Sequence, residues 1–168
     1  MADPLAAGDA APAFTAPRDG GGAVSLADHA GRIVVLYFYP RDDTPGCTLQ
    51  ARDFTALAAE FAAAGAVVIG VSKDSVRKHD RFRDKHALGI ALLSDADTAI
   101  AGEYGVWKEK SLYGKTHMGI ERSTFVIDGT GTIQYAQRKV RAAGHAAQVL
   151  EVVRGLSRDA TRPQGVLI

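Results

Sequence analysis

Cysteine is the residue that this sequence has least of: its 168 residues include one, Cys47. A single cysteine excludes a disulfide within the chain and a metal cluster held by several thiolates. Two interpretations of the residue remain open, an inert buried thiol and a reactive one. The position of Cys47 in the chain therefore becomes the main question.

Excess charge and long apolar runs are also absent. Lysine and arginine number 20 against 19 aspartates and glutamates, and this balance gives no reason to expect a nucleic-acid or anionic-membrane partner. The longest strongly apolar run, residues 33–39, is far below the roughly 18 to 20 residues of a membrane helix. The first residues show no targeting pattern. We therefore expect a soluble cytoplasmic protein, because a lone thiol stays reduced there.

Apolar segments and helical patterns alternate along the chain, without internal repeats. Strands are expected at residues 33–38, 66–71, 91–93, 123–127 and 132–136. A first helix is expected to follow the loop at 40–46 and to end at Gly65. Further helices are expected at residues 74–86, 97–104 and 143–154. Apolar positions 54, 57, 58 and 61 mark the buried face of the first helix. Asp74 or Ser75 can cap the second.

Two turn patterns complete the predicted architecture. Residues 128–131, Asp-Gly-Thr-Gly, predict a β-hairpin between the last two strands, and the glycines at 20–22 predict an N-terminal hairpin. We predict one domain over residues 1–168, with loose segments at 2–16 and 157–168. The class is α/β, with a mixed central sheet flanked by helices. The same order of elements is found in a thioredoxin-like fold.

Cys47 lies where the loop at 40–46 meets the first helix. The first turn of a helix has unpaired backbone N–H groups and the positive end of the helix dipole, and both favour a thiolate. A cysteine with a purely structural role is expected on the apolar helix face or inside a strand. The position therefore favours the reactive interpretation.

Residues 39–48, Tyr-Pro-Arg-Asp-Asp-Thr-Pro-Gly-Cys-Thr, resemble the peroxidatic loop of the peroxiredoxins, whose pattern is Pro-x-x-x-Thr-x-x-Cys. The Thr-Pro-Gly-Cys-Thr form is similar to that of the bacterioferritin comigratory protein, or Q-type, subfamily. Further similar segments follow in the same order, at residues 8–14, 71–75, 104–107 and 119–128. The resemblance covers about residues 8–155.

The resemblance implies reduction of hydrogen peroxide and organic hydroperoxides, with the family's roles carried onto four residues. Cys47 would attack the peroxide as a thiolate and become a sulfenic acid. Thr44 would hydrogen-bond the peroxide, Arg122 would supply a cation beside the sulfur, and Pro40 would wall off the pocket. Without the resemblance, Arg122 is an ordinary solvated charge, Thr44 a turn residue and Pro40 the end of a strand. No metal, haem or flavin is implied.

The chain departs from its relatives in having no resolving cysteine. Q-type relatives carry it on the first helix, where this chain has Arg52, or on the next helix near residues 82–84. We therefore expect an external thiol reductant, either thioredoxin, glutaredoxin or glutathione, and a monomer or weak homodimer. The alternative is a redox sensor or relay that passes oxidation of Cys47 to a partner. A disulfide oxidoreductase is disfavoured because Cys-x-x-Cys is missing, and a cysteine hydrolase because no histidine is placed as a base.

Other polar residues receive structural interpretations. The five histidines lack metal-ligand spacing, and we place His79 and His86 on a solvated helix face without an acidic partner nearby. The basic residues at 77–85 alternate with aspartates and predict a charged helix surface. Thr48 and Gln50 are expected to cap the helix locally. A substrate or partner role is left open for His117.

Overall fold

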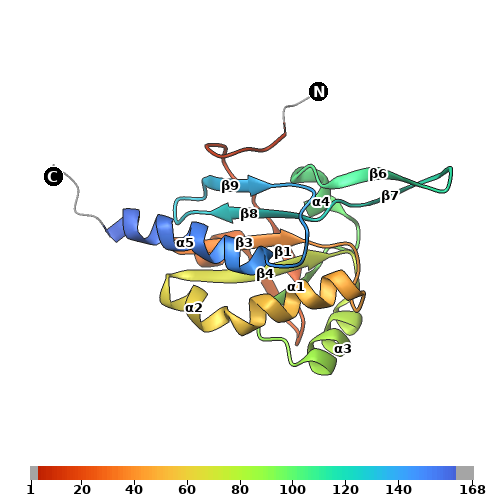
Figure 1. The fold of residues 1–168 in the computed structure, drawn as a ribbon, viewed down its shortest axis with the longest axis horizontal. Helices are drawn as coiled ribbons and strands as arrows, with labels where there is room; N and C mark the ends of the chain where they lie inside the picture. Colours follow the sequence, from red (N-terminus) through yellow and green to blue (C-terminus); the bar gives the residue numbers. More distant parts are fainter. Residues whose placement is uncertain (1–3, 162–168) are drawn as a thin grey trace.

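A five-stranded mixed sheet forms the middle of the computed structural model, which describes residues 4–161 (Figure 1). Its strand order is β5-β4-β3-β8-β9. The strands are β3 (Ile33–Phe38), β4 (Ala66–Ser72), β5 (Ala91–Ser94), β8 (Ser123–Ile127) and β9 (Ile133–Gln137). β3 pairs in parallel with β4 and antiparallel with β8. The predicted mixed α/β sheet is confirmed.

Alternate residues of β3 belong to two separate cores, one on each face of the sheet. Val35 and Tyr37 point to one core, and Leu36 and Phe38 point to the other. The first face is covered by α1 (Pro45–Ala56), α2 (Ala58–Ala63), α3 (Val76–His86) and α5 (His145–Thr161). The opposite face is covered by α4 (Ala99–Glu103) and by the N-terminal hairpin. Burial of β3 on both faces, as its unbroken apolar run predicts, is confirmed.

The N-terminal hairpin pairs β1 (Thr15–Pro17) with β2 (Ala23–Ser25) and is followed by the short 3-10 helix η1 (Leu26–His29). Gly20, Gly21 and Gly22 form its turn with φ values of 78°, 99° and 79°. Residues with a side chain rarely adopt such φ values, so the turn itself requires three glycines in succession. The predicted hairpin is confirmed.

Two helices differ from their predicted bounds. The first predicted helix is divided at Leu57, whose φ of −100° and ψ of 3° separate α1 from α2. Phe54 and Phe61, one on each side of this break, are still fully buried. The last helix continues beyond the predicted end at residue 154 as far as Thr161, so residues 157–161 are helical rather than loose. Residues 162–168 of that predicted loose segment lie outside the described residues.

A second hairpin, β6 (Trp107–Leu112) with β7 (Lys115–Ile120), was not predicted. It extends away from the sheet in Figure 1, and most of its residues are exposed on both faces. Because the hairpin buries almost nothing, it has no apolar alternation that could reveal it. Its turn residues Tyr113 and Gly114 have φ values of 52° and 77°, which is typical of a two-residue hairpin turn.

Gly70 in β4 determines how closely α1 approaches the sheet. A Cβ at this position would lie 2.9 Å from both Cζ and Oη of Tyr37. The Tyr37 ring stacks on Phe54 of α1, with ring centroids 4.7 Å apart. The missing side chain at residue 70 therefore leaves the space in which Tyr37 supports the helix that carries Cys47.

The variant Gly70→Ala should lose about 1–3 kcal/mol of unfolding free energy, because the buried Tyr37 ring has no free space to move into. Urea denaturation measures this change. Gly102→Ala in α4 is the control, since no atom beyond the adjacent residues and the helix's own backbone lies within 4 Å of the added Cβ. That variant should be unchanged or gain up to about 1 kcal/mol. A Gly70→Ala protein as stable as the parent would contradict this view of the packing.

Candidate active site

Cys47 is the third residue of α1 and is 1% exposed. Thr44 is the N-cap of the helix and has an extended backbone (φ −95°, ψ 157°). Pro45 follows in the first turn, where its missing N–H is not needed. The Thr48 N–H donates to the Thr44 carbonyl at 2.8 Å, closing the first turn around the sulfur. The predicted position of Cys47 at a helix start is confirmed.

Arg122 contacts the sulfur from a part of the chain 75 residues away. Its Nη2 donates to Cys47 Sγ at 3.3 Å, and its Nη1 donates to Gln50 Oε1 at 2.6 Å. The guanidinium packs so closely on the helix start that a Cβ at Gly46 would lie 3.1 Å from Nη2. The Val140 N–H donates to the Arg122 carbonyl at 2.9 Å and fixes its backbone. The alternative interpretation of Arg122 as an ordinary solvated charge is wrong.

Pro40 and Thr44 bracket the loop that leads into α1. Pro40 follows the buried Tyr39 at the end of the central strand and is half-buried. Thr44 is half-buried as well, and its Oγ1 donates to the Arg41 carbonyl at 3.0 Å. The hydroxyl therefore holds the loop in shape, and its oxygen lone pairs are available to accept a hydrogen bond.

Gln50 does not cap the helix as expected. It is fully buried and accepts from Arg122, so it holds the guanidinium toward the sulfur. Its Nε2, together with Tyr37 Oη, is among the buried polar atoms without a partner in residues 4–161. Residues three apart on a helix share a face, and the spacing of Cys47 and Gln50 was the sequence signal for this role.

Lys110, on the β6–β7 hairpin, adds a second cation to this environment. Burial, followed by the nearby Arg122, lowers the pKa of its half-buried ammonium group, while Cys47 acts in the opposite direction. Burial raises the pKa of Tyr37, and the nearby Cys47 sulfur is the next largest cause of this increase. The buried sulfur therefore has the Arg122 guanidinium in contact with it and the Lys110 ammonium near enough to interact with it.

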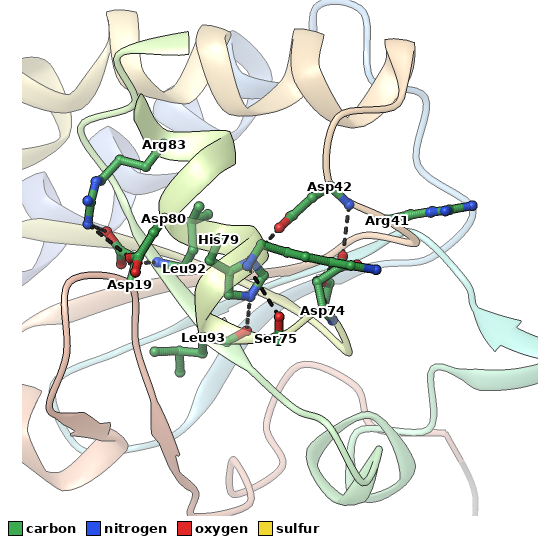
Figure 2. A network of polar contacts seen from close by, with 12 residues as sticks. Asp19, Arg41, Asp42, Asp74, Ser75, His79, Asp80, Arg83, Leu92 and Leu93 are labelled. Atoms are coloured by element: carbon green, nitrogen blue, oxygen red, sulfur yellow. Dashed lines mark hydrogen bonds and ion pairs between the residues drawn. The ribbon is translucent and has the colours of Figure 1, made fainter. Parts of the chain in front are cut away.

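The predicted solvated face at His79 and His86 is wrong. His79 is fully buried, with Nδ1 at 2.6 Å from Asp42 Oδ2 (Figure 2), and His86 Nε2 lies 2.9 Å from Asp43 Oδ1. The partners come from the loop before α1, 37 and 43 residues away, so helix spacing alone gave no sign of them. The basic residues at 77–85 are mostly exposed, as predicted.

Comparison with known proteins places this arrangement in a family. Residues 7–136 match the AhpC/TSA family. A putative peroxiredoxin Bcp of Coxiella burnetii is 48% identical over 143 residues, which cover 85% of this chain and 95% of that protein. Peroxiredoxin Bcp of Xanthomonas campestris is 49% identical over 135 residues, covering 80% and 84%. The chain belongs to the AhpC/TSA family, among its Bcp-type peroxiredoxins.

The solved structures agree with this assignment. The bacterioferritin comigratory protein of Xanthomonas campestris, described for its alkyl peroxide reduction activity, matches with a TM-score of 0.82 and 45% identity. The match covers 86% of this chain and 92% of that one. The thioredoxin-like fold is therefore confirmed, and the resemblance drawn from residues 39–48 is correct.

Two features are absent from residues 4–161 of this peroxiredoxin. Among residues 4–161, no group of three or more histidine, cysteine, aspartate or glutamate side chains is placed to hold a metal ion. None of the helices in that part of the chain is long and apolar enough to cross a membrane.

His145 packs behind the active site of the peroxiredoxin as a neutral base. It is 1% exposed, and its Nε2 lies 2.8 Å from Thr124 Oγ1. Burial lowers its pKa to about 4, and the positive charge of Arg122 contributes in the same direction. The site therefore has its cation at Arg122 and an uncharged imidazole behind it.

This histidine should make the peroxiredoxin sensitive to acid. The unfolded chain takes up a proton on His145 near pH 6.5 and the folded chain only near pH 4, so the stabilisation is complete above 6.5 and is lost as the pH falls. Between pH 7 and 5 the parent should lose about 2 kcal/mol that His145→Gln does not lose. Urea denaturation at both pH values measures the difference.

The matched control is His117→Gln, which changes an exposed histidine on the β6–β7 hairpin. Its pH dependence should equal that of the parent. If His145→Gln also follows the parent between pH 7 and 5, His145 is not the group responsible.

Proposed function

We propose that Cys47 is the peroxidatic nucleophile of a one-cysteine peroxidase that an external thiol returns to its reduced state. The observation that carries this proposal is the 3.3 Å contact between Arg122 Nη2 and the only thiol of the chain, at a helix start. The published alkyl peroxide reduction of the Xanthomonas campestris relative supports organic hydroperoxides as substrates beside hydrogen peroxide.

In the first step, the Cys47 thiolate attacks the terminal oxygen of the hydroperoxide. A sulfur–oxygen bond forms, the O–O bond breaks, and the departing hydroxide or alkoxide takes up a proton from solvent to leave as water or an alcohol. The sulfur is oxidised by two electrons to a sulfenic acid, and the peroxide is reduced by two. Arg122 stabilises the negative charge as it spreads from the sulfur over the peroxide oxygens.

The neighbouring groups hold the peroxide for this attack. Thr44 Oγ1 already donates to the Arg41 carbonyl, so it can accept a hydrogen bond from the peroxide O–H. Pro40 walls the pocket without offering a donor of its own. Gln50 accepts from Arg122 and holds the guanidinium toward the sulfur.

The second step needs a thiol from outside, because no second cysteine exists in the sequence. One thiol condenses with the sulfenic acid to give a mixed disulfide and water. A second thiol then attacks this disulfide, which releases Cys47 and the oxidised reductant. Glutathione, glutaredoxin and thioredoxin all supply such thiols. The cycle needs no residue from a second copy, so a monomer or weak homodimer suffices.

Replacing Cys47 by serine should abolish peroxide consumption in the presence of glutathione or thioredoxin with its reductase, because a hydroxyl is not ionised at neutral pH. Following peroxide concentration over time measures this. Arg52→Gln, on the exposed side of the same helix, is the control and should keep the parent rate. Substantial turnover in the serine variant would exclude Cys47 as the nucleophile.

One equivalent of peroxide should add one oxygen atom to the intact mass of the protein, and subsequent glutathione should convert that species to a mixed disulfide and then to the starting mass. Mass spectrometry of samples quenched at each stage follows these changes. A covalent dimer instead would show that a second copy acts as the resolving partner. A sulfenic acid that persists with glutathione and with thioredoxin would favour the sensor role over a peroxidase.

A further inference from the structure

His79 is held inside the protein between two oxygen acceptors. Its Nδ1 lies 2.6 Å from Asp42 Oδ2 and its Nε2 lies 2.8 Å from the Leu93 carbonyl (Figure 2). A carbonyl oxygen only accepts, and Asp42 also accepts from Tyr39 Oη at 2.6 Å. Nε2 of His79 therefore donates to Leu93, and Nδ1 shares a proton with the Asp42 carboxyl, so the two side chains form a buried hydrogen-bonded pair.

The surroundings of this pair favour a proton on the ring. Burial alone lowers the pKa of His79, but the hydrogen bond and negative charge of Asp42 raise it by more, with further contributions from Leu93 and Asp74. The net pKa lies above its ordinary value. The groups that face the ring are acceptors from β5, from the β4–α3 junction and from the loop before α1.

The Asp42 side of the pair belongs to the segment that presents Cys47. Asp42 lies in the loop at residues 40–44, between the end of β3 and the start of α1. Its backbone N–H donates to Asp74 Oδ2 at 2.8 Å, and Asp74 accepts from Ser72 Oγ at 2.7 Å. The buried network therefore joins this loop to α3 and to the ends of β4 and β5, as Figure 2 shows.

The other side-chain contacts between the loop and α3 are more exposed. Lys85 Nζ and His86 Nε2 lie 2.7 and 2.9 Å from the carboxylate of Asp43, whose side chain is 43% exposed. Solvent and salt weaken such pairs, whereas removal of one partner from a buried pair leaves an uncompensated charge. Among these contacts, the His79–Asp42 pair is the one that resists movement of the loop most strongly.

The proposed cycle makes opposite demands on this loop. Cys47 is 1% exposed, and hydrogen peroxide is small enough to reach the sulfur without a large movement of the loop. A thiol that attacks the oxidised sulfur brings its carbon chain with it, so the start of α1 has to move outward before the two sulfurs can meet. The equilibrium between a closed and an open loop therefore sets how fast the second step proceeds.

We infer that His79 is a positioning residue that holds the 40–44 loop closed through Asp42 and so limits access of thiols to Cys47. The inference rests on the proposed function. Loss of His79 raises the small fraction of molecules in which the loop is open. The fraction with a closed loop stays near one until the two fractions become comparable. Access to Cys47 by large reagents therefore increases strongly, and the reaction with peroxide changes little or falls.

The test measures access directly, with a bulky aromatic disulfide, 5,5′-dithiobis(2-nitrobenzoic acid), as the probe. Its thiolate release reports the reaction of the single cysteine and needs no peroxidase activity. For His79→Gln, which keeps a neutral donor, we expect this rate to rise about tenfold, the effect of a tenfold larger open fraction. The rate constant for oxidation by hydrogen peroxide, followed by intact mass, should stay equal or fall by less than about twofold.

Two further variants keep the comparison decisive. Arg83→Gln, also in α3, breaks ion pairs with Asp19, Asp80 and Asp84 without touching the loop, and its probe rate should equal that of the parent. Tyr39→Phe removes one hydrogen bond to Asp42 and keeps the ring, so it should raise the probe rate in the same direction by less. If His79→Gln does not fold, the probe rate of Tyr39→Phe tests the inference in its place.

Each outcome has one meaning. Probe rates at the parent level or below in both His79→Gln and Tyr39→Phe overturn the inference. A rise equal to that of Arg83→Gln also overturns it, because it shows only general loosening of α3. A parent protein whose Cys47 is not oxidised by peroxide refutes the proposed function instead, and the probe comparison still decides whether His79 holds the loop.

Discussion

The hydrogen bond between Arg122 and Cys47 depends on the antiparallel pairing of two central strands. In that pairing Phe38, the last residue of β3, lies opposite Ser123, the first residue of β8. The chain therefore enters β8 beside the point where it leaves β3 for α1, and Arg122 precedes β8 next to the helix start. A parallel pairing would place that arginine at the other end of the sheet.

What could be predicted from the sequence was local. The unbroken apolar runs gave the buried strands, and the Thr-Pro-Gly turn gave the helix start that carries Cys47. The contact to Arg122 came only from a resemblance, because nothing within 75 residues of chain indicates it. The β6–β7 hairpin and the role of Lys110 were missed for a related reason. A hairpin that buries little leaves no periodic pattern, and its effect on the site is electrostatic over distance.

The two buried histidines show most clearly why burial and charge escape a sequence-based prediction. His79 and His145 are both inside the protein, and the sequence assigns neither a partner. His79 meets the Asp42 carboxylate, which raises its pKa, whereas His145 meets the Thr124 hydroxyl, and burial with Arg122 nearby lowers its pKa to about 4. The pKa values of the two histidines are thus shifted in opposite directions by surroundings that tertiary packing fixes.

These charges explain how one thiol can be both protected and used. A site closed around Cys47 strengthens the Arg122 contact, since buried surroundings screen it less, and it favours small oxidants such as hydrogen peroxide. The same closure excludes the thiols that must finish the reaction, and a chain without a second cysteine has no internal substitute for them. The stability of the loop before α1 is therefore a compromise between the two steps. A buried ion pair suits it, because the pair is strong while intact and is lost as a unit when the loop opens.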